Sequence, residues 1–270
     1  MAPQEDGLSR FPFMRRLILE EPVSRAAIWS RRIATFALFV AGIAIALSRM
    51  GAFSSGNAIL VFAAALVLAG LAALLSGAAG VVIWRTGRPG AGIAAQGLLL
   101  ALALLAWPAK LAVDAITLPA INDISTDLET PPAYMRSTRA LEARAGRTPP
   151  ETSREMREQQ KLAYPHVQPA LIDMEPAQAY QLALRLAKAH GWRIVDATPP
   201  NVRDGIAHID ATDRSLVFGF VDDIAIRITP LVNQTRIDLR SSSRVGRHDL
   251  GANARRIEAF AADALAVAGR

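Results

Sequence analysis

The sequence predicts an α+β protein in which three transmembrane helices precede an antiparallel sheet of about four to five strands, with helices packed on one face. Three observations support this prediction. Long apolar runs fill most of residues 33–113, and short stretches of alternating polar and apolar residues follow in residues 169–270. Two segments with the periodicity of amphipathic helices flank these alternating stretches.

The three apolar runs have the length and composition of membrane spans. They cover about residues 33–48, 58–84 and 91–110, and Lys110 is the only ionisable side chain within them. The first run is the shortest, about 24 Å in a helix, and arginines at both of its ends can extend to the lipid headgroups. Buried helices of a globular protein are the alternative, but no polar face recurs within the runs. Spans without internal charges are typical of an anchor rather than a transporter.

Basic residues around the runs predict the orientation in the membrane. Residues 1–113 contain ten Lys/Arg and four Asp/Glu, whereas residues 114–270 contain twenty of each, so the whole net charge of +6 lies in the first part. Six arginines lie in residues 1–32 and two in the loop before the third run. The positive-inside rule therefore predicts a basic cytoplasmic tail over residues 1–32 and places everything after the third span on the opposite side.

Residues 114–168 form a polar segment that is predicted to connect the membrane region, residues 33–113, with the domain. Prolines at positions 131, 132, 149, 150 and 165 divide this segment into short pieces. We therefore expect no more than one or two short helices, within residues 136–161, and a path that partly wraps the domain.

The compact domain is predicted to cover residues 169–270. Its first helix should begin at Glu175-Pro176 and stop at Gly191, because proline favours the first helical position and glycine favours the C-terminal stop. Asp249 is expected to cap the last helix, which runs from Leu250 to about Ala268. Five strands are expected between these helices, at Trp192–Val195, Ile206–Thr212, Ser215–Phe220, Ile224–Thr229 and Thr235–Ser241.

Alternation of apolar residues also predicts how the strands pair. In the last hairpin, Ile228 opposite Ile237 places the aliphatic side chains on one face, and the same register sets Arg227 opposite Asp238 on the other face. By the same reasoning, the second and third strands are expected to form a hairpin with one apolar and one polar face. Such a sheet would be covered by helices on its apolar face.

Three stretches of the second half resemble a known bacterial family. They are Asn-Asp-Ile-Ser-Thr-Asp at 122–127, Phe-Val-Asp-Asp-Ile-Ala-Ile-Arg at 220–227, and the segment 237–257, which contains Arg-Ser-Ser-Ser-Arg-Val-Gly-Arg. Together with Tyr164-Pro165, they resemble the family catalogued as domain of unknown function 1499, over about residues 121–268. The resemblance implies a bacterial protein with spans ahead of the domain, and it implies no activity. Together with the orientation predicted from the basic residues, this places the spans in the cytoplasmic membrane and the domain in the periplasm.

Acidic residues of the second half are the first candidates for a metal site. Calcium loops need several ligands at fixed spacing around a glycine, and no such pattern is present. We therefore predict no metal ion and no cofactor. The acids Asp123, Asp127, Asp222 and Asp223 are expected to pair with arginines instead.

A Ser/His/Asp triad is the main catalytic possibility, from Ser241–Ser243, His248 and Asp249. No Gly-x-Ser-x-Gly turn is present, and Asp249 is expected to cap a helix. We therefore predict no catalytic residues.

The segment from residue 240 to residue 253 runs from a strand end, through a glycine turn, into a helix N-terminus. Guanidinium groups, hydroxyls and free backbone N–H groups could converge there on a phosphate, a lipid headgroup or a glycan carboxylate. The alternative, which we favour, is that the arginines pair with the four acids above and fasten the connecting segment to the sheet. The candidate anion-site residues are Arg240, Ser242, Arg244, Arg247 and Asn253.

Two functions therefore remain. The first, which we favour, is a membrane-anchored envelope protein with a non-enzymatic binding or structural domain outside the cytoplasmic membrane. Its expected partners are the lipid bilayer and an envelope protein or anionic ligand, but not nucleic acid, because the domain has no net charge. The alternative is an envelope hydrolase or other enzyme that uses the Arg/Ser/Asp cluster of residues 240–253.

Overall fold

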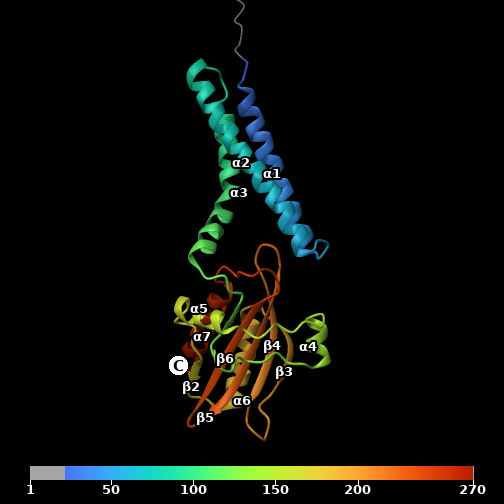
Figure 1. Cartoon of the computed structure of the whole chain (residues 1–270), viewed down its shortest axis with the longest axis vertical. Coiled ribbons are helices and arrows are strands. Elements are labelled where there is room, and N and C mark those ends of the chain that lie inside the picture. Colours follow the sequence, from blue (N-terminus) through green and yellow to red (C-terminus); the bar gives the residue numbers. More distant parts are fainter. Residues whose placement is uncertain (1–21, 270) are drawn as a thin grey trace, which may run out of the picture.

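The computed structural model describes residues 22–269, with three long helices at one end and an α+β domain at the other (Figure 1). The helices are α1 (Arg25–Arg49), α2 (Ser55–Thr86) and α3 (Ala91–Thr117). Each is long and apolar enough to cross a membrane. Most of the basic tail predicted over residues 1–32 lies outside the described residues.

Two of the helices extend clearly beyond the apolar runs that predicted them. α1 begins earlier, at Arg25, and α3 continues past Lys110. An ion pair between Lys110 and Asp114, with 2.6 Å between Nζ and Oδ2, supports this polar extension of α3 on successive turns. The helix ends where Leu118 precedes Pro119, because a residue before proline favours the extended conformation, here φ −101° and ψ 151°.

α1 and α2 pack through small side chains. Their buried positions recur at alternate spacings of three and four residues, as in a coiled coil. On α1 these positions are Ala27, Ser30, Ala34, Ala37, Ala41 and Ala44. On α2 they are Ala58, Phe62, Ala65, Ala69, Ala72, Ser76 and Ala79. Small residues let two helix backbones approach closely, which supplies the van der Waals contact that holds helices together in lipid.

α3 crosses α1 at Gly97. A Cβ atom at this position would lie 2.8 Å from the backbone nitrogen of Arg31, closer than real Cβ atoms approach other atoms. Glycine is therefore required for this helix crossing.

The domain contains a six-stranded antiparallel sheet of order β1-β6-β5-β4-β3, in which β2 also pairs with β6. Helices α6 (Pro176–Ala189) and α7 (Ala252–Ala268) pack on its apolar face and bury the core. The strands are β1 (Asp123–Ser125), β2 (Ala170–Ile172), β3 (Arg193–Thr198), β4 (Ala207–Arg214), β5 (Val221–Leu231) and β6 (Gln234–Ser243). This confirms the predicted fold class.

The segment of residues 114–168 contributes more to the domain than a connection. It contains the two short helices α4 (Thr138–Ala143) and α5 (Arg154–Ala163), and it also supplies β1 at the edge of the sheet. The sheet therefore gains a strand before the predicted start of the domain at residue 169.

The predicted register of the last hairpin agrees with the structure. β5 and β6 pair with Ile228 opposite Ile237 and Arg227 opposite Asp238. The last helix, α7, begins two residues later than predicted, at Ala252, and its N-cap is Gly251 rather than Asp249. Asp249 still binds the first turn of the helix. Its Oδ2 atom accepts a hydrogen bond of 2.8 Å from the backbone N–H of residue 253.

The strand predicted at Ser215–Phe220 is wrong. These residues form the loop between β4 and β5, and β4 pairs directly with β5, so that Ile209 lies opposite Ile226 rather than Phe218. The alternating apolar side chains that suggested a strand include Phe218, which packs against Phe62 of α2 instead, with 5.1 Å between ring centroids. The local pattern could not indicate this partner, because Phe62 is remote in sequence.

Leu239→Ala should lower the free energy of unfolding of the domain by about 2–5 kcal/mol, because a large buried side chain is removed from the core. Leu239 is fully buried, and Leu162 of α5 is 84% exposed and provides a matched control. Leu162→Ala should change the stability by about 0.5 kcal/mol or less. Thermal or urea unfolding of the detergent-solubilised protein measures both values, and equal effects would contradict the core described here.

Candidate functional site

The sheet has a polar face opposite α6 and α7. Charged and hydroxyl side chains occupy alternate positions of β4, β5 and β6 on this face. The segment between β1 and α5 crosses this face in Figure 1, and it covers most of these side chains. They are Asp210 on β4, Asp223 and Arg227 on β5, and Asp238, Arg240 and Ser242 on β6.

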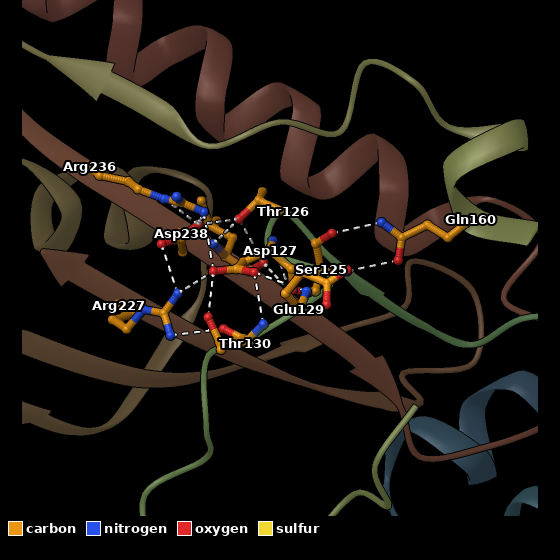
Figure 2. A network of polar contacts seen from close by, with 10 residues as sticks. Ser125, Thr126, Asp127, Glu129, Thr130, Gln160, Arg227, Arg236 and Asp238 are labelled. Carbon is orange, nitrogen blue, oxygen red and sulfur yellow. Dashed lines mark hydrogen bonds and ion pairs between the residues drawn. The ribbon is translucent and has the colours of Figure 1, made fainter. Parts of the chain in front are cut away.

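Two arginines and two carboxylates fasten the start of the crossing segment to β5 and β6 (Figure 2). Asp127 lies 2.9 Å from Arg227 Nη2 and 3.2 Å from Arg236 Nη2. Both arginines also contact Asp238, at 3.0 Å and 2.9 Å. Burial alone would raise the pKa of Asp127, but hydrogen bonds from Thr130 and Arg227 lower it below its usual value.

Gln160 of α5 closes the edge of the sheet beside β1, as Figure 2 also shows. Its Oε1 atom accepts a hydrogen bond of 3.1 Å from the backbone N–H of Ser125, and its Nε2 atom donates one of 2.7 Å to the carbonyl of the same residue. The side-chain amide thus takes the place of a neighbouring strand and satisfies an otherwise free edge.

Tyr134 lies at the centre of the covered face. The guanidinium carbons of Arg240 and Arg144 lie 5.0 Å and 5.5 Å from the centre of its ring, within the range of cation–π interaction. Its hydroxyl donates a hydrogen bond of 3.2 Å to the carbonyl of Asp223. Burial, together with the nearby carboxylate of Asp123, raises the pKa of Tyr134 well above its ordinary value.

Two of the predicted anion-site arginines form bidentate ion pairs. Arg240 binds Asp123 of β1 through Nε and Nη2, at 3.0 Å and 2.6 Å. Arg244 binds Asp223 through the same two atoms, at 2.8 Å and 2.6 Å, and Nη2 also donates to the carbonyl of Ala143 at the end of α4. Arg240 Nη2 also donates a hydrogen bond of 3.0 Å to the carbonyl of Pro150, so both arginines tie the crossing segment to the sheet through its backbone carbonyls.

The other two predicted acidic partners pair with arginines outside residues 240–247. Asp127 binds Arg227 and Arg236, as described above. Asp222 points to the opposite face and lies 2.7 Å from Arg256 of α7.

A cavity of about 280 Å³ lies between residues 147–152 and the ends of β5 and β6 that are nearest the three long helices. Its lining includes the carboxylates of Asp123, Glu151 and Asp223 and the guanidiniums of Arg147 and Arg244. The three acidic and two basic residues leave the lining with one net negative charge. The cavity therefore suits a polar ligand of low net charge better than a free anion.

The predicted anion-site residues divide between this cavity and its surroundings. Ser242 and Arg244 line the cavity. Arg240 is bound to a carboxylate of the cavity lining, and Asn253 is buried and hydrogen-bonded to side chains of β6. Arg247 is exposed and lies outside the lining.

The residues of the considered triad are hydrogen-bonded to other groups instead of to one another. The hydroxyl of Ser241 donates a hydrogen bond of 2.7 Å to Asn253 Oδ1, and His248 Nδ1 accepts one of 3.0 Å from the backbone N–H of Leu250. The carboxylate of Asp249 accepts a hydrogen bond from the backbone N–H of residue 253 at the start of α7. Within residues 22–269, no group of three or more His, Cys, Asp or Glu side chains could hold a metal ion.

One buried ion pair was missed by the sequence reasoning. Arg144 of the crossing segment lies 2.6 Å from Asp210 of β4, and the two side chains are only 2% and 3% exposed. Asp210 Oδ1 and Arg144 Nε have no hydrogen-bond partner among the described residues. Burial raises the pKa of Asp210 to about 6, although Arg144 and the backbone N–H of Met135 act in the opposite direction.

Arg244→Ala should lower the free energy of unfolding by about 1–3 kcal/mol, because it leaves the carboxylate of Asp223 buried without its partner. The variant should also be cut earlier by protease within residues 123–168. Arg247→Ala removes an exposed arginine from the same loop and should leave both measurements unchanged. If the two variants behave alike, Arg244 does not fasten the segment.

The raised pKa of Asp210 predicts a pH dependence of stability. The folded chain binds the proton of the Asp210 carboxyl group more tightly than the unfolded chain does. The stability gained from binding this proton is therefore complete below the ordinary carboxyl pKa of 3.8 and is lost as the pH rises through about 6. From pH 7 to pH 4, the wild type should gain on the order of 2 kcal/mol relative to Asp210→Asn. His208, whose pKa is lowered by burial, contributes the opposite pH dependence of stability in both proteins. Subtracting the free energy of unfolding of the variant from that of the wild type at each pH removes this contribution. A difference that does not change with pH would contradict the shift.

A family model described as a protein of unknown function, DUF1499, matches residues 123–263. The match agrees with the resemblance over residues 121–268, and it contains β1, the polar face, the cavity and most of α7. Comparison with curated proteins and with solved structures gives no match. Because the match covers more than half of the chain, the protein belongs to the DUF1499 family, whose function is unknown.

Proposed function

We propose that this protein is anchored in the bacterial cytoplasmic membrane by α1–α3, and that its domain acts in the cell envelope in a non-enzymatic binding or structural role. The distribution of basic residues along the three helices is the main support. Figure 1 shows the start of α1 and the loop between α2 and α3 at the end remote from the domain. The basic residues near that end are Arg25, Arg31, Arg32, Arg85 and Arg88.

The opposite ends of the helices are much less basic. Arg49 ends α1, and Lys110 near the end of α3 is paired with Asp114. Basic residues favour the cytoplasmic side of a membrane, so the remote end is cytoplasmic and the domain lies outside.

A binding or structural role agrees with the chemistry of the polar face. Its buried arginines are held by carboxylates, an arrangement that fastens one segment to another. The cavity at the helix-proximal end of the sheet is the proposed binding site for an envelope partner or a small polar ligand. An anionic ligand is the second candidate, because Arg147 is exposed and lines the cavity together with Ser242.

Reporter fusions test the location. Alkaline phosphatase fused at Gly269 should be active and green fluorescent protein fused there should not fluoresce, because the domain is expected outside the cytoplasm. Fusions at Arg88, in the loop between α2 and α3, should give the reverse result. A fusion in the loop between α1 and α2, at residue 52, should agree with Gly269. A cytoplasmic signal from Gly269 would overturn the envelope location.

A further inference from the structure

The loop between β4 and β5, residues 215–220, extends from the sheet to the three long helices, as Figure 1 shows. Its base is closed by hydrogen bonds of 2.8 Å from the backbone N–H of Ser215 to the carbonyl of Phe220, and of 2.9 Å from the N–H of Gly219 to the carbonyl of Ser215. The loop is therefore held in a compact conformation by its own backbone hydrogen bonds.

The end of α1 holds this loop. Ser48 Oγ donates a hydrogen bond of 2.9 Å to the carbonyl of Phe218, and Arg49 Nη1 donates to the carbonyls of Leu216 and Val217. The backbone of the loop is thereby fixed at the level where the apolar run of α1 ends.

Aromatic side chains extend this contact to α2 and α3. The ring of Phe218 packs edge-on against Phe62 of α2, and its centroid lies 6.4 Å from that of Trp107 of α3. Phe220 stacks on Phe218 at 5.1 Å within the loop. Tryptophan near the end of a span is typical of the headgroup region of a membrane, so the loop lies at that level.

The tip of the loop is apolar and uncovered. Leu216 is 90% exposed, and Met50, which follows α1, is 79% exposed. The side chains of Arg49 and Arg214 beside them are also exposed. Apolar side chains flanked by arginines at the level of a headgroup region match the pattern of segments that lie in a membrane interface.

We propose that the loop of residues 215–220 is a second membrane contact, in which Leu216 enters the boundary between headgroups and acyl chains of the phospholipid leaflet on the domain's side. This inference rests on the spans of the proposed function. The loop contacts all three helices, through Ser48 and Arg49 of α1, Phe62 of α2 and Trp107 of α3, so the exposed tip lies beside the proposed spans. The contact would hold the start of β5, and with it Asp223 of the cavity lining, close to the membrane, because β5 begins directly after the loop.

Single spin labels can measure the depth of this residue, because the chain contains no cysteine. Leu216→Cys should leave the fold intact, since the side chain is exposed. Leu74→Cys on α2 and Val232→Cys at the far hairpin of the sheet, 74% and 87% exposed, are the membrane and water references. Each full-length variant is labelled and reconstituted in vesicles of phosphatidylcholine and phosphatidylglycerol. Collision rates of the label are then measured with oxygen, which concentrates in hydrocarbon, and with a water-soluble nickel chelate.

The ratio of oxygen to nickel accessibility at residue 216 should be several-fold higher than at residue 232 and lower than at residue 74, because the proposed contact lies at the boundary of the acyl chains. A ratio equal to that at residue 232 would overturn the membrane contact while leaving the spans intact. A label at residue 216 that neither reagent reaches would show that protein, such as a second copy of this chain, covers the tip, and would also overturn it. A water-like ratio at residue 74 would instead contradict the membrane spans, and with them the proposed function.

Discussion

Arg240 lies in β6, where its guanidinium binds Asp123 of β1 through Nε and Nη2 and also lies over the ring of Tyr134. This one side chain joins the sheet, the first residue of its edge strand and the segment that crosses the polar face. A charge buried in this way is tolerated only with its partner in place, because desolvation of an unpaired ion costs several kcal/mol. The path of the crossing segment therefore depends on the ion pairs beneath it, and the cavity depends on that path.

The three long helices depend on shape rather than on charge. α1 and α2 pack through the close fit of small side chains, mostly alanines, along one stripe of each helix. The loop before β5 links the two halves of the molecule. It brings Phe218 against Phe62 and Trp107, while Ser48 and Arg49 hold its backbone. The domain is thus attached to the helices by a second contact as well as by the chain after α3.

The chemistry of the polar face explains why a binding or structural role is favoured over catalysis. Catalytic groups need to be free to exchange protons or to attack a substrate, and a nucleophile needs a base within hydrogen-bond distance. Here the arginines bind carboxylates, and Ser241 donates to Asn253. What remains accessible is a polar cavity at the end of the sheet nearest the three long helices, with Arg147 and Glu151 at its exposed wall.

Much of the fold follows from sequence periodicity. Uninterrupted apolar runs determined the three long helices, and the two-residue alternation determined the register of β5 and β6, because a slip of one residue would bury Arg227. The same alternation was misleading at Ser215–Phe220, since it shows which side chains share a face but not which surface covers that face. Tertiary structure alone decided that Phe218 meets α2 and that Asp210 is buried beside Arg144. Those partners are distant in the chain, and only the folded path of the connecting segment and of the three long helices brings them together.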